Sequence, residues 1–213
     1  MGRLSAPGST FAAVTAIRQG TGVVVVDDAS RENEGDVVFA ASFVSESQIA
    51  FMMNHCRGLI CAAMAGEDVD RLGLPPMVQD NREPFRTAFT VSVDARLGVT
   101  TGISAADRAR TARLLADPAS TAEDFVMPGH LFPLRAVQGG VRSRRGHTEA
   151  AIELTRLAGL APVGIICEVA GEDGRMLKGA GLRDFARVHG LPILSISDLV
   201  CTVEEDVRSA SSA

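Results

Sequence analysis

Residues 23–40 read VVVVDDASRENEGDVVFA, and they say more about the fold class than any other stretch of the chain. The run Val23–Val26 is wholly apolar and β-branched, which is typical of a short strand that is covered on both faces of a sheet. A second apolar run follows at 36–40, so the polar residues between the two runs form a loop that joins two buried strands. We therefore expect layers of helix on both faces of the sheet.

Helical and strand-like segments alternate along the rest of the chain. Helices are predicted from apolar spacing and from Ser-x-x-Gln or Ser-x-x-Asp capping patterns at 9–19, 45–55, 67–72, 104–116, 148–157, 182–189 and from about 197. Strands are predicted at 59–64, 88–93, 134–137, 163–169 and 193–196, and the Pro- and Gly-containing segment 123–133 is predicted as an ordered loop. This order favours an α+β domain with a mixed β-sheet between two layers of helices, an α/β/α arrangement.

Length, composition and charge limit the classes of protein to which this chain can belong. The chain has 213 residues, 46% hydrophobic and 22% charged, so we expect one domain over 1–213, with a core over about 9–203 and a frayed tail at 204–213. A net charge of −5 and the lack of Trp and Tyr disfavour nucleic-acid and membrane-surface binding. Four cysteines without a CxxC pair, and no recognisable signal peptide or membrane span, favour a reduced, cytoplasmic protein.

The acidic loop between the first two predicted strands holds five carboxylates and a single arginine, Arg31. If the loop is extended, Glu32, Glu34 and Asp36 project to the same side at steps of roughly 6 to 7 Å. Carboxylates that share a pocket favour a divalent cation, a cationic partner or a raised pKa suited to proton transfer. A solvated acidic turn is the alternative that the loop alone leaves open.

A basic segment, Arg142-Ser-Arg-Arg-Gly-His-Thr-Glu-Ala150, leads into the predicted helix at 148–157. The first turn of a helix offers free N–H groups and the positive end of the helix dipole. Arg144, Arg145 and the hydroxyl of Thr148 add further donors, and we expect Thr148 or its neighbour to cap the helix. The segment therefore predicts a phosphate site with His147 beside it, and an exposed basic loop before an ordinary helix is the alternative.

His130 and Glu168 are candidates for acid–base chemistry. His130 lies between two prolines in Met127-Pro-Gly-His-Leu-Phe-Pro133, which restrict its backbone. Glu168 ends a predicted strand, and strand ends in α/β sheets open onto crevices that bind ligands. The alternatives are a surface histidine and a strand-end carboxylate that faces water.

Four motifs occur in a fixed order: Asp27-Asp28 with Arg31-Glu-Asn-Glu-Gly-Asp36, Thr100-Thr-Gly-Ile-Ser-Ala-Ala-Asp-Arg108, Pro128-Gly-His-Leu-Phe-Pro-Leu-Arg135 and Gly146-His-Thr-Glu-Ala150. Together they closely resemble the 3,4-dihydroxy-2-butanone 4-phosphate synthase family of riboflavin biosynthesis. The resemblance extends from the first predicted helix to about Val203. It implies a lyase that converts D-ribulose 5-phosphate to L-3,4-dihydroxy-2-butanone 4-phosphate and formate by enolisation, dehydration, skeletal rearrangement and loss of C4.

The resemblance also implies a set of site residues. Glu32 and His147 are expected to ligate Mg²⁺ or Mn²⁺, with two divalent ions per site and no redox cofactor. His130 and Glu168 are expected to be essential catalytic groups. Substrate contacts are implied for Arg31, Glu32, Asp36, Thr101, Arg144, Arg145, Gly146, His147, Thr148 and Glu168. A homodimer with its sites near the subunit interface is implied as well.

The chain departs from the family pattern at Arg145, where many relatives have Gly, so we expect either a stiffer phosphate loop or one more positive charge on it. It also ends soon after these motifs, so we expect a monofunctional protein without the GTP cyclohydrolase II domain that follows in many relatives. Two other functions stay open at this point. One is another metal-dependent pentose-phosphate isomerase or epimerase. The other is a nucleotide- or RNA-binding module of related fold, which the acidic charge disfavours.

Overall fold

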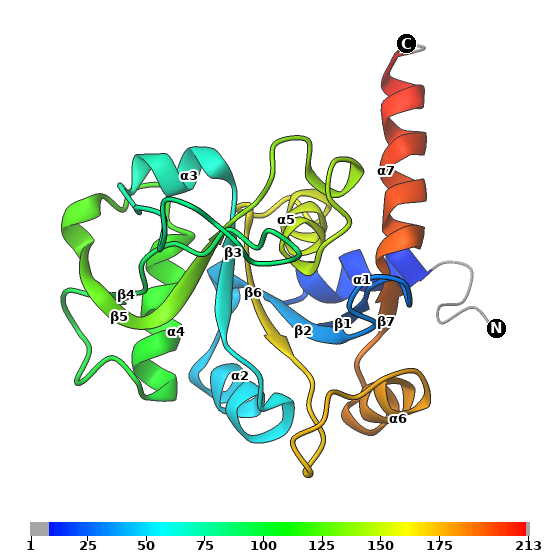
Figure 1. Ribbon diagram of the computed structural model, residues 1–213, viewed down its shortest axis with the longest axis horizontal. Helices are drawn as coiled ribbons and strands as arrows, with labels where there is room; N and C mark the ends of the chain where they lie inside the picture. Colours follow the sequence, from blue (N-terminus) through cyan, green and yellow to red (C-terminus); the bar gives the residue numbers. More distant parts are fainter. Residues whose placement is uncertain (1–8, 212–213) are drawn as a thin grey trace.

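The structure is a computed structural model, and it describes residues 9–211. Its centre is a seven-stranded sheet with the strand order β4-β5-β3-β6-β2-β1-β7 (Figure 1). β1 pairs in parallel with β7, and β3 with β5, whereas the other neighbours are antiparallel. The strands are β1 (Val23–Val26), β2 (Gly35–Ala40), β3 (Cys61–Met64), β4 (Val93–Ala95), β5 (Phe125–Arg135), β6 (Val163–Glu168) and β7 (Ile193–Ser195).

Helices cover both faces of this sheet. They are α1 (Ser9–Arg18), α2 (Glu46–Phe51), α3 (Gly66–Arg71), α4 (Ala105–Leu115), α5 (His147–Leu157), α6 (Ala180–His189) and α7 (Ile196–Ser211). Residues of α2, α4 and α6 pack in one buried apolar cluster together with Val24 and Val26, and residues of α1, α5 and α7 pack in a second cluster together with Val23 and Val25. The two clusters lie on opposite faces because successive side chains of a strand point to opposite sides. The predicted single α/β/α domain with a mixed sheet is confirmed.

Helix starts follow the predicted capping residues at two places. Ser45 and Gln48 form the predicted capping box of α2, which continues into a π-helical turn over Met52–Cys56. The hydroxyl of Ser104 accepts a hydrogen bond from the amide of Asp107 at the start of α4. None of the helices within 9–211 has the length and hydropathy needed to cross a bilayer.

Two predictions on the β4–β5 side of the sheet are wrong, one of a loop and one of a strand. Residues 125–133 belong to strand β5, although a loop was expected there. Pro128 is tolerated because it lies in a stretch of β5 that has no partner on β4, and the carbonyl of Pro133 still accepts a hydrogen bond from the amide of Thr90. The strand predicted at 88–93 is reduced to isolated bridges before β4 begins at Val93.

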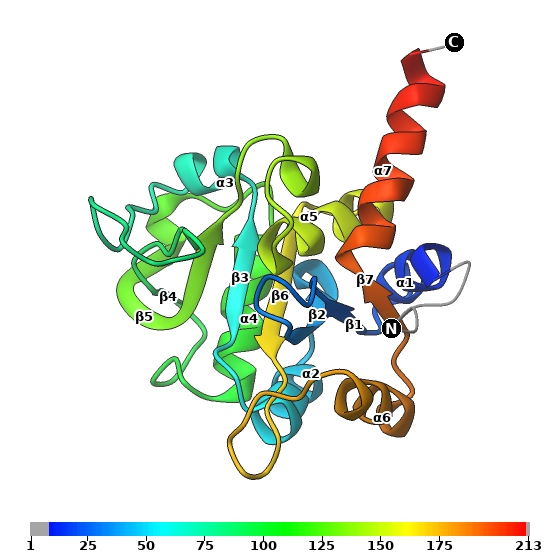
Figure 2. The ribbon, with the colours of Figure 1, turned by 45° about the vertical axis from the view of Figure 1, so that its right-hand side comes forward.

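Helix α7 is longer than the sequence indicates. It continues through 204–211, where we expected a frayed tail, and an ion pair of 3.4 Å joins Glu204 to Arg208 one turn later. Residues 212 and 213 of the expected tail lie outside the described residues. The two views show the far end of α7 projecting beyond the sheet (Figures 1 and 2).

Candidate functional site

The acidic loop between β1 and β2 folds around the buried carboxylate of Asp27. This carboxylate accepts hydrogen bonds from the amides of Glu32 and Glu34, both at 2.9 Å, and from the guanidinium of Arg31 at 3.1 Å. The loop turns at 29–32, and Asn33 adopts a left-handed conformation with φ 56°. The predicted row of carboxylates required an extended loop, and the loop is not extended. The role of Asp27 in shaping the loop was not predicted from the sequence.

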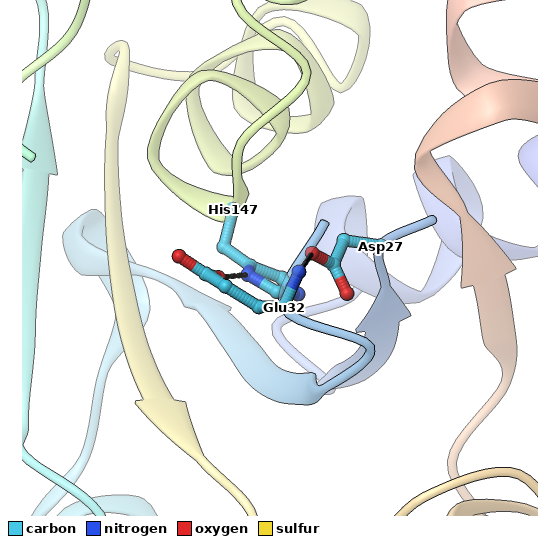
Figure 3. Close-up of side chains that lie close together, drawn as sticks. All are labelled: Asp27, Glu32 and His147. Atoms are coloured by element: carbon cyan, nitrogen blue, oxygen red, sulfur yellow. Dashed lines mark hydrogen bonds and ion pairs between the residues drawn. The ribbon is translucent and has the colours of Figure 1, made fainter. Parts of the chain in front are cut away.

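Glu32, Asp36 and His147 form a cluster at the start of α5. The Nδ1 atom of His147 lies 3.5 Å from Oε2 of Glu32 and 3.8 Å from Oδ1 of Asp36. Figure 3 shows the imidazole of His147 reaching from the first turn of α5 toward Glu32, and the carboxylate of Asp27 pointing toward the backbone of Glu32. One ligand atom each from Asp27, Glu32 and His147 lies within 4.8 Å of the other two. The structure thus brings together the two metal ligands predicted from sequence.

Burial and charge shift the protonation of this cluster strongly. Burial raises the pKa of Asp36 to about 7, and the nearby carboxylates of Glu168, Glu32 and Glu34 act in the same direction. Burial alone would lower the pKa of His147, but the carboxylates around it outweigh burial and raise the pKa to about 9. Such shifts are typical of groups that bind ions or move protons, since each charge is held by its neighbours and not by water.

The donor set fits a hard divalent cation. Oδ1 of Asp36 and Nε2 of His147 are buried and lack a hydrogen-bond partner among the described residues. Both oxygens of Asp27 are already used by groups of its own loop. Carboxylate oxygens are the ligands that Mg²⁺ prefers, and imidazole with carboxylate also suits Mn²⁺. Glu32, His147 and Asp36 therefore have more capacity for a new partner than Asp27 has.

Glu168 lies beside this cluster at the end of β6. It is directly opposite Asp36 in the antiparallel pairing of β2 with β6, so the two side chains share one face of the sheet. Its Oε2 atom accepts a hydrogen bond of 2.9 Å from the amide of Leu59. Gly58 has no side chain, and a Cβ there would lie 2.5 Å from the Glu168 carboxylate. The predicted strand-end carboxylate thus faces the site.

The basic segment forms the turn before α5, but its arginines differ in role. Arg144 is held by Glu149 at 2.6 Å, by Thr87 at 3.0 Å and by the carbonyl of Phe85 at 3.2 Å. The Arg145 side chain is 53% exposed and lies 4.0 Å from Asp28. The guanidinium of Arg145 is therefore more available than that of Arg144 to bind an anion.

The start of α5 differs from the prediction. Gly146 is the N-cap, and no side chain caps the helix. The proposed cap by Thr148 is therefore wrong, and Thr148 is buried inside the first turn. An uncapped first turn leaves backbone N–H groups without intrahelical partners, which favours an anion at this end.

The segment around Phe85 was missed by sequence reasoning. The carbonyl of Phe85 accepts hydrogen bonds from Arg144, and the Arg31 guanidinium lies over the Phe85 ring, 5.1 Å from its centroid. This segment therefore connects the acidic loop to the basic turn. Nothing in the local sequence indicates it, because the contacts join residues more than fifty positions apart.

His130 and Thr101 lie apart from the cluster. The Nδ1 atom of His130 lies 2.7 Å from Oδ2 of Asp94, and Thr101 is exposed in the loop before α4. Within 9–211, no hydrogen bond or ion pair connects either residue to Glu32 or His147. The predicted catalytic role of His130 and the predicted substrate contact of Thr101 stay predictions.

Comparison with known proteins gives a consistent result. The profile of the 3,4-dihydroxy-2-butanone 4-phosphate synthase family matches residues 12–202. A protein of that name from Agrobacterium fabrum is 55% identical over 195 residues, which cover 92% of this chain and 92% of that protein. The riboflavin biosynthesis protein RibBA of Salinispora tropica is 53% identical over 193 residues, which cover 91% of this chain and 48% of that protein.

A solved structure agrees with these relatives. It is a crystal structure of 3,4-dihydroxy-2-butanone 4-phosphate synthase in complex with two magnesium ions, and it superposes with a TM-score of 0.87 at 49% identity. The match covers 91% of this chain and 95% of that one. The chain therefore belongs to the 3,4-dihydroxy-2-butanone 4-phosphate synthase family.

Proposed function

We propose that the protein is a lyase of riboflavin biosynthesis that converts D-ribulose 5-phosphate to L-3,4-dihydroxy-2-butanone 4-phosphate and formate. The observation that carries this proposal is the cluster of half-buried Glu32 with buried Asp36 and His147 at the uncapped start of α5. A cation site beside an anion site suits a sugar phosphate, whose hydroxyl oxygens and phosphate need opposite kinds of partner. Membership of the family supports the same reaction.

Mg²⁺ or Mn²⁺ is the proposed cofactor, with two ions per site, and Glu32 and His147 are its proposed ligands. The unpartnered Oδ1 atom of Asp36 and Nε2 atom of His147 support the assignment. The magnesium-bound structure of the relative supports it as well. When bound, the ions supply positive charge that stabilises negative charge developing on the oxygens of the substrate.

The phosphate is assigned to the first turn of α5 and to Arg145. Gly146 and Thr148 flank the free N–H groups of this turn, and Arg145 adds a mobile positive charge. Arg144 fixes the turn through Glu149, and Arg31 is fixed by Asp27 and Glu32. The phosphate is thereby held away from the carbons that react.

Proton transfer is assigned to Glu168 and His130, with Asp36 beside Glu168. With a pKa of about 7, Asp36 can exist in both protonation states near neutral pH. Enolisation and dehydration need groups of this kind, because each step moves a proton between carbon or oxygen and the protein. Thr101 is proposed as a further substrate contact.

A cytoplasmic homodimer with sites near its interface completes the proposal. Val126 and Met127, which lie close to His130 in sequence, expose 39% and 37% of their surface, and exposed apolar side chains favour burial against a partner. The four cysteines are free thiols, as is typical of a reducing compartment.

The proposed reaction is tested by measuring formate from purified protein and D-ribulose 5-phosphate. We expect formate with Mg²⁺, none after treatment with EDTA, and recovery when Mg²⁺ is added back. Interconversion of pentose phosphates without formate would replace the proposal by an isomerase or epimerase. No reaction of folded, magnesium-loaded protein would refute an enzyme acting on this substrate.

A further inference from the structure

His130 is presented by an irregular stretch of the β4–β5 pair. Val93 pairs with Leu131, but the next residue of β4, Asp94, pairs with Val126. Residues 127–130 of β5 therefore have no backbone partner on β4, which is the terminal strand of the sheet. Such bulges at sheet edges re-aim side chains and are frequent beside active sites.

Two side chains of the β4 segment take the place of the missing backbone partners. The hydroxyl of Ser92 accepts a hydrogen bond from the amide of Gly129 at 3.2 Å, and Oδ1 of Asp94 accepts one from the amide of His130 at 2.9 Å. The second oxygen of Asp94 lies 2.7 Å from Nδ1 of the His130 ring. A single carboxylate thus holds both the backbone and the ring of His130.

The surroundings of Asp94 hold its carboxylate in place. Asp94 is 6% exposed, and the backbone of Gly102 packs so closely on the carboxylate that a Cβ there would collide with it. The guanidinium of Arg108 is also buried. Burial lowers the pKa of Arg108, whereas the nearby charge of Asp94 acts in the opposite direction. Both oxygens of this carboxylate face His130, one at its amide and one at its ring, and a carboxylate group offers acceptors and no donor.

We propose that Asp94 is a positioning residue that fixes the tautomer of His130, with the proton on Nδ1 and the lone pair on Nε2. Because the carboxylate can only accept, Nδ1 must donate, and Nε2 is left as the basic nitrogen of the neutral ring. The side chain of His130 is 43% exposed, so this ring is within reach of a ligand while its partner is buried. The catalytic consequence rests on the proposed function of His130, whereas the tautomer does not.

The substitution Asp94→Asn separates this role from a merely structural one. The amide of His130 needs an acceptor, so the single carbonyl oxygen of Asn takes the place of Oδ1. The NH₂ group of Asn must then face Nδ1 and donate to it, which moves the ring proton to Nε2. The backbone bond and the loop are kept, and only the tautomer is reversed.

The test is nitrogen-15 NMR of the imidazoles above their pKa, in the full-length protein. The chain has four histidines, so the His130 signals can be assigned by their loss in His130→Gln. We expect a protonated Nδ1 in the wild type and in Ser92→Ala, which loosens the loop without touching the ring, and a protonated Nε2 in Asp94→Asn. A protonated Nε2 in the wild type, or an unchanged tautomer in Asp94→Asn, would overturn the proposal. The wild-type measurement does not depend on a variant that folds.

Kinetics of formate release provide the second readout. In Asp94→Asn we expect kcat to fall on the order of 10²- to 10⁴-fold with little change in KM, since a positioned acid–base group contributes that much. Reversal of the tautomer with an unchanged kcat would confirm the positioning role but remove His130 from the proposed chemistry. If the wild type releases no formate, the proposed function fails, and the NMR result still decides the tautomer.

Discussion

At the scale of single residues, the ligand candidates differ in how far their hydrogen-bonding capacity is already used. Asp27 accepts hydrogen bonds from three donors of its own loop. Asp36 and His147 each bury an atom that has no partner among the described residues. A buried polar atom without a partner is destabilising, so its presence indicates where an ion or a substrate completes the site. Asp27 shapes the loop, and the other two residues offer free ligand atoms to the proposed site.

Replacing Glu32 by Gln tests the proposed metal site most directly, because the change removes the charge of a proposed ligand and keeps the side-chain size. We expect Mg²⁺ affinity, measured by titration calorimetry, to fall by at least the roughly 10- to 100-fold that loss of an outer hydrogen bond to a ligand causes. Asp28→Asn in the same loop is the matched control, since Asp28 only approaches Arg145 at 4.0 Å. Equal losses in both variants would mean that the loop acts only through its total charge.

The sequence predicts the pairing of Glu32 with His147, because both lie in motifs that resemble the family, and the structure places the two side chains 3.5 Å apart. It does not predict the role of Asp27, which depends on the turn at 29–32 and on the left-handed Asn33. The sequence shows that Arg144 is positively charged, but it does not predict the ion pair with Glu149 that neutralises this charge. Such roles are set by contacts across the fold and not by local residue type.

At the scale of elements, buried strands are predicted well and the β4–β5 side of the sheet is not. β1 and β6 are covered on both faces, so their continuous apolar runs identify them. β5 carries Pro128, Gly129 and Pro133 and is partly exposed, so its sequence resembles a loop. Its strand structure depends on pairing with β3 and on the side chains of the β4 segment, which no local pattern indicates.

Gly129→Ala tests how closely this side of the sheet is packed. A Cβ at Gly129 would collide with the backbone of Val93 and Asp94, which cannot move without shifting β4. We expect the free energy of unfolding, measured with urea, to fall by about 1 to 3 kcal/mol. Gly181→Ala in α6 is the control, because its nearest neighbour is the Leu177 side chain at 3.5 Å, and it should stabilise by up to about 1 kcal/mol. Equal stability of Gly129→Ala and the wild type would contradict the packing.

The start of α4 is predicted to lose stability in acid. A hydrogen bond from the Thr100 hydroxyl is the main reason that the pKa of Asp107 is lowered to about 2, and the amides of Thr100 and Gly102 add to it. Because the folded pKa lies below the ordinary 3.8, this stabilisation is fully present above pH 3.8 and is lost as the pH falls toward 2. Below that range a protonated Asp107 resembles Asn.

Asp107→Asn should therefore unfold at lower urea concentration than the wild type at about pH 6, and the difference should shrink as the pH falls to about 3. The measurement is the urea midpoint of both proteins across this range. A difference that stays constant with pH would show that the carboxylate charge contributes nothing to the start of α4.

At the scale of the whole molecule, the topology brings distant parts of the chain together at one end of the central strands. β1 ends and β2 begins there, β6 ends there with Glu168 opposite Asp36, and α5 begins there with His147. The two layers of helices pack on both faces of the sheet, and the far end of α7 projects beyond it (Figure 2). The proposed cation ligands, the carboxylates of Asp36 and Glu168 and the N-terminus of α5 therefore lie together at the proposed site.

The measurement that tests the central claim most directly follows carbon-13 from D-ribulose 5-phosphate labelled only at C4. We predict that, with Mg²⁺ present, the label leaves as formate and the four-carbon phosphate product is unlabelled, and that Glu32→Gln gives neither product at a comparable rate. Label retained in a pentose phosphate, or found in the four-carbon product, would contradict loss of C4 at the Glu32–His147 site.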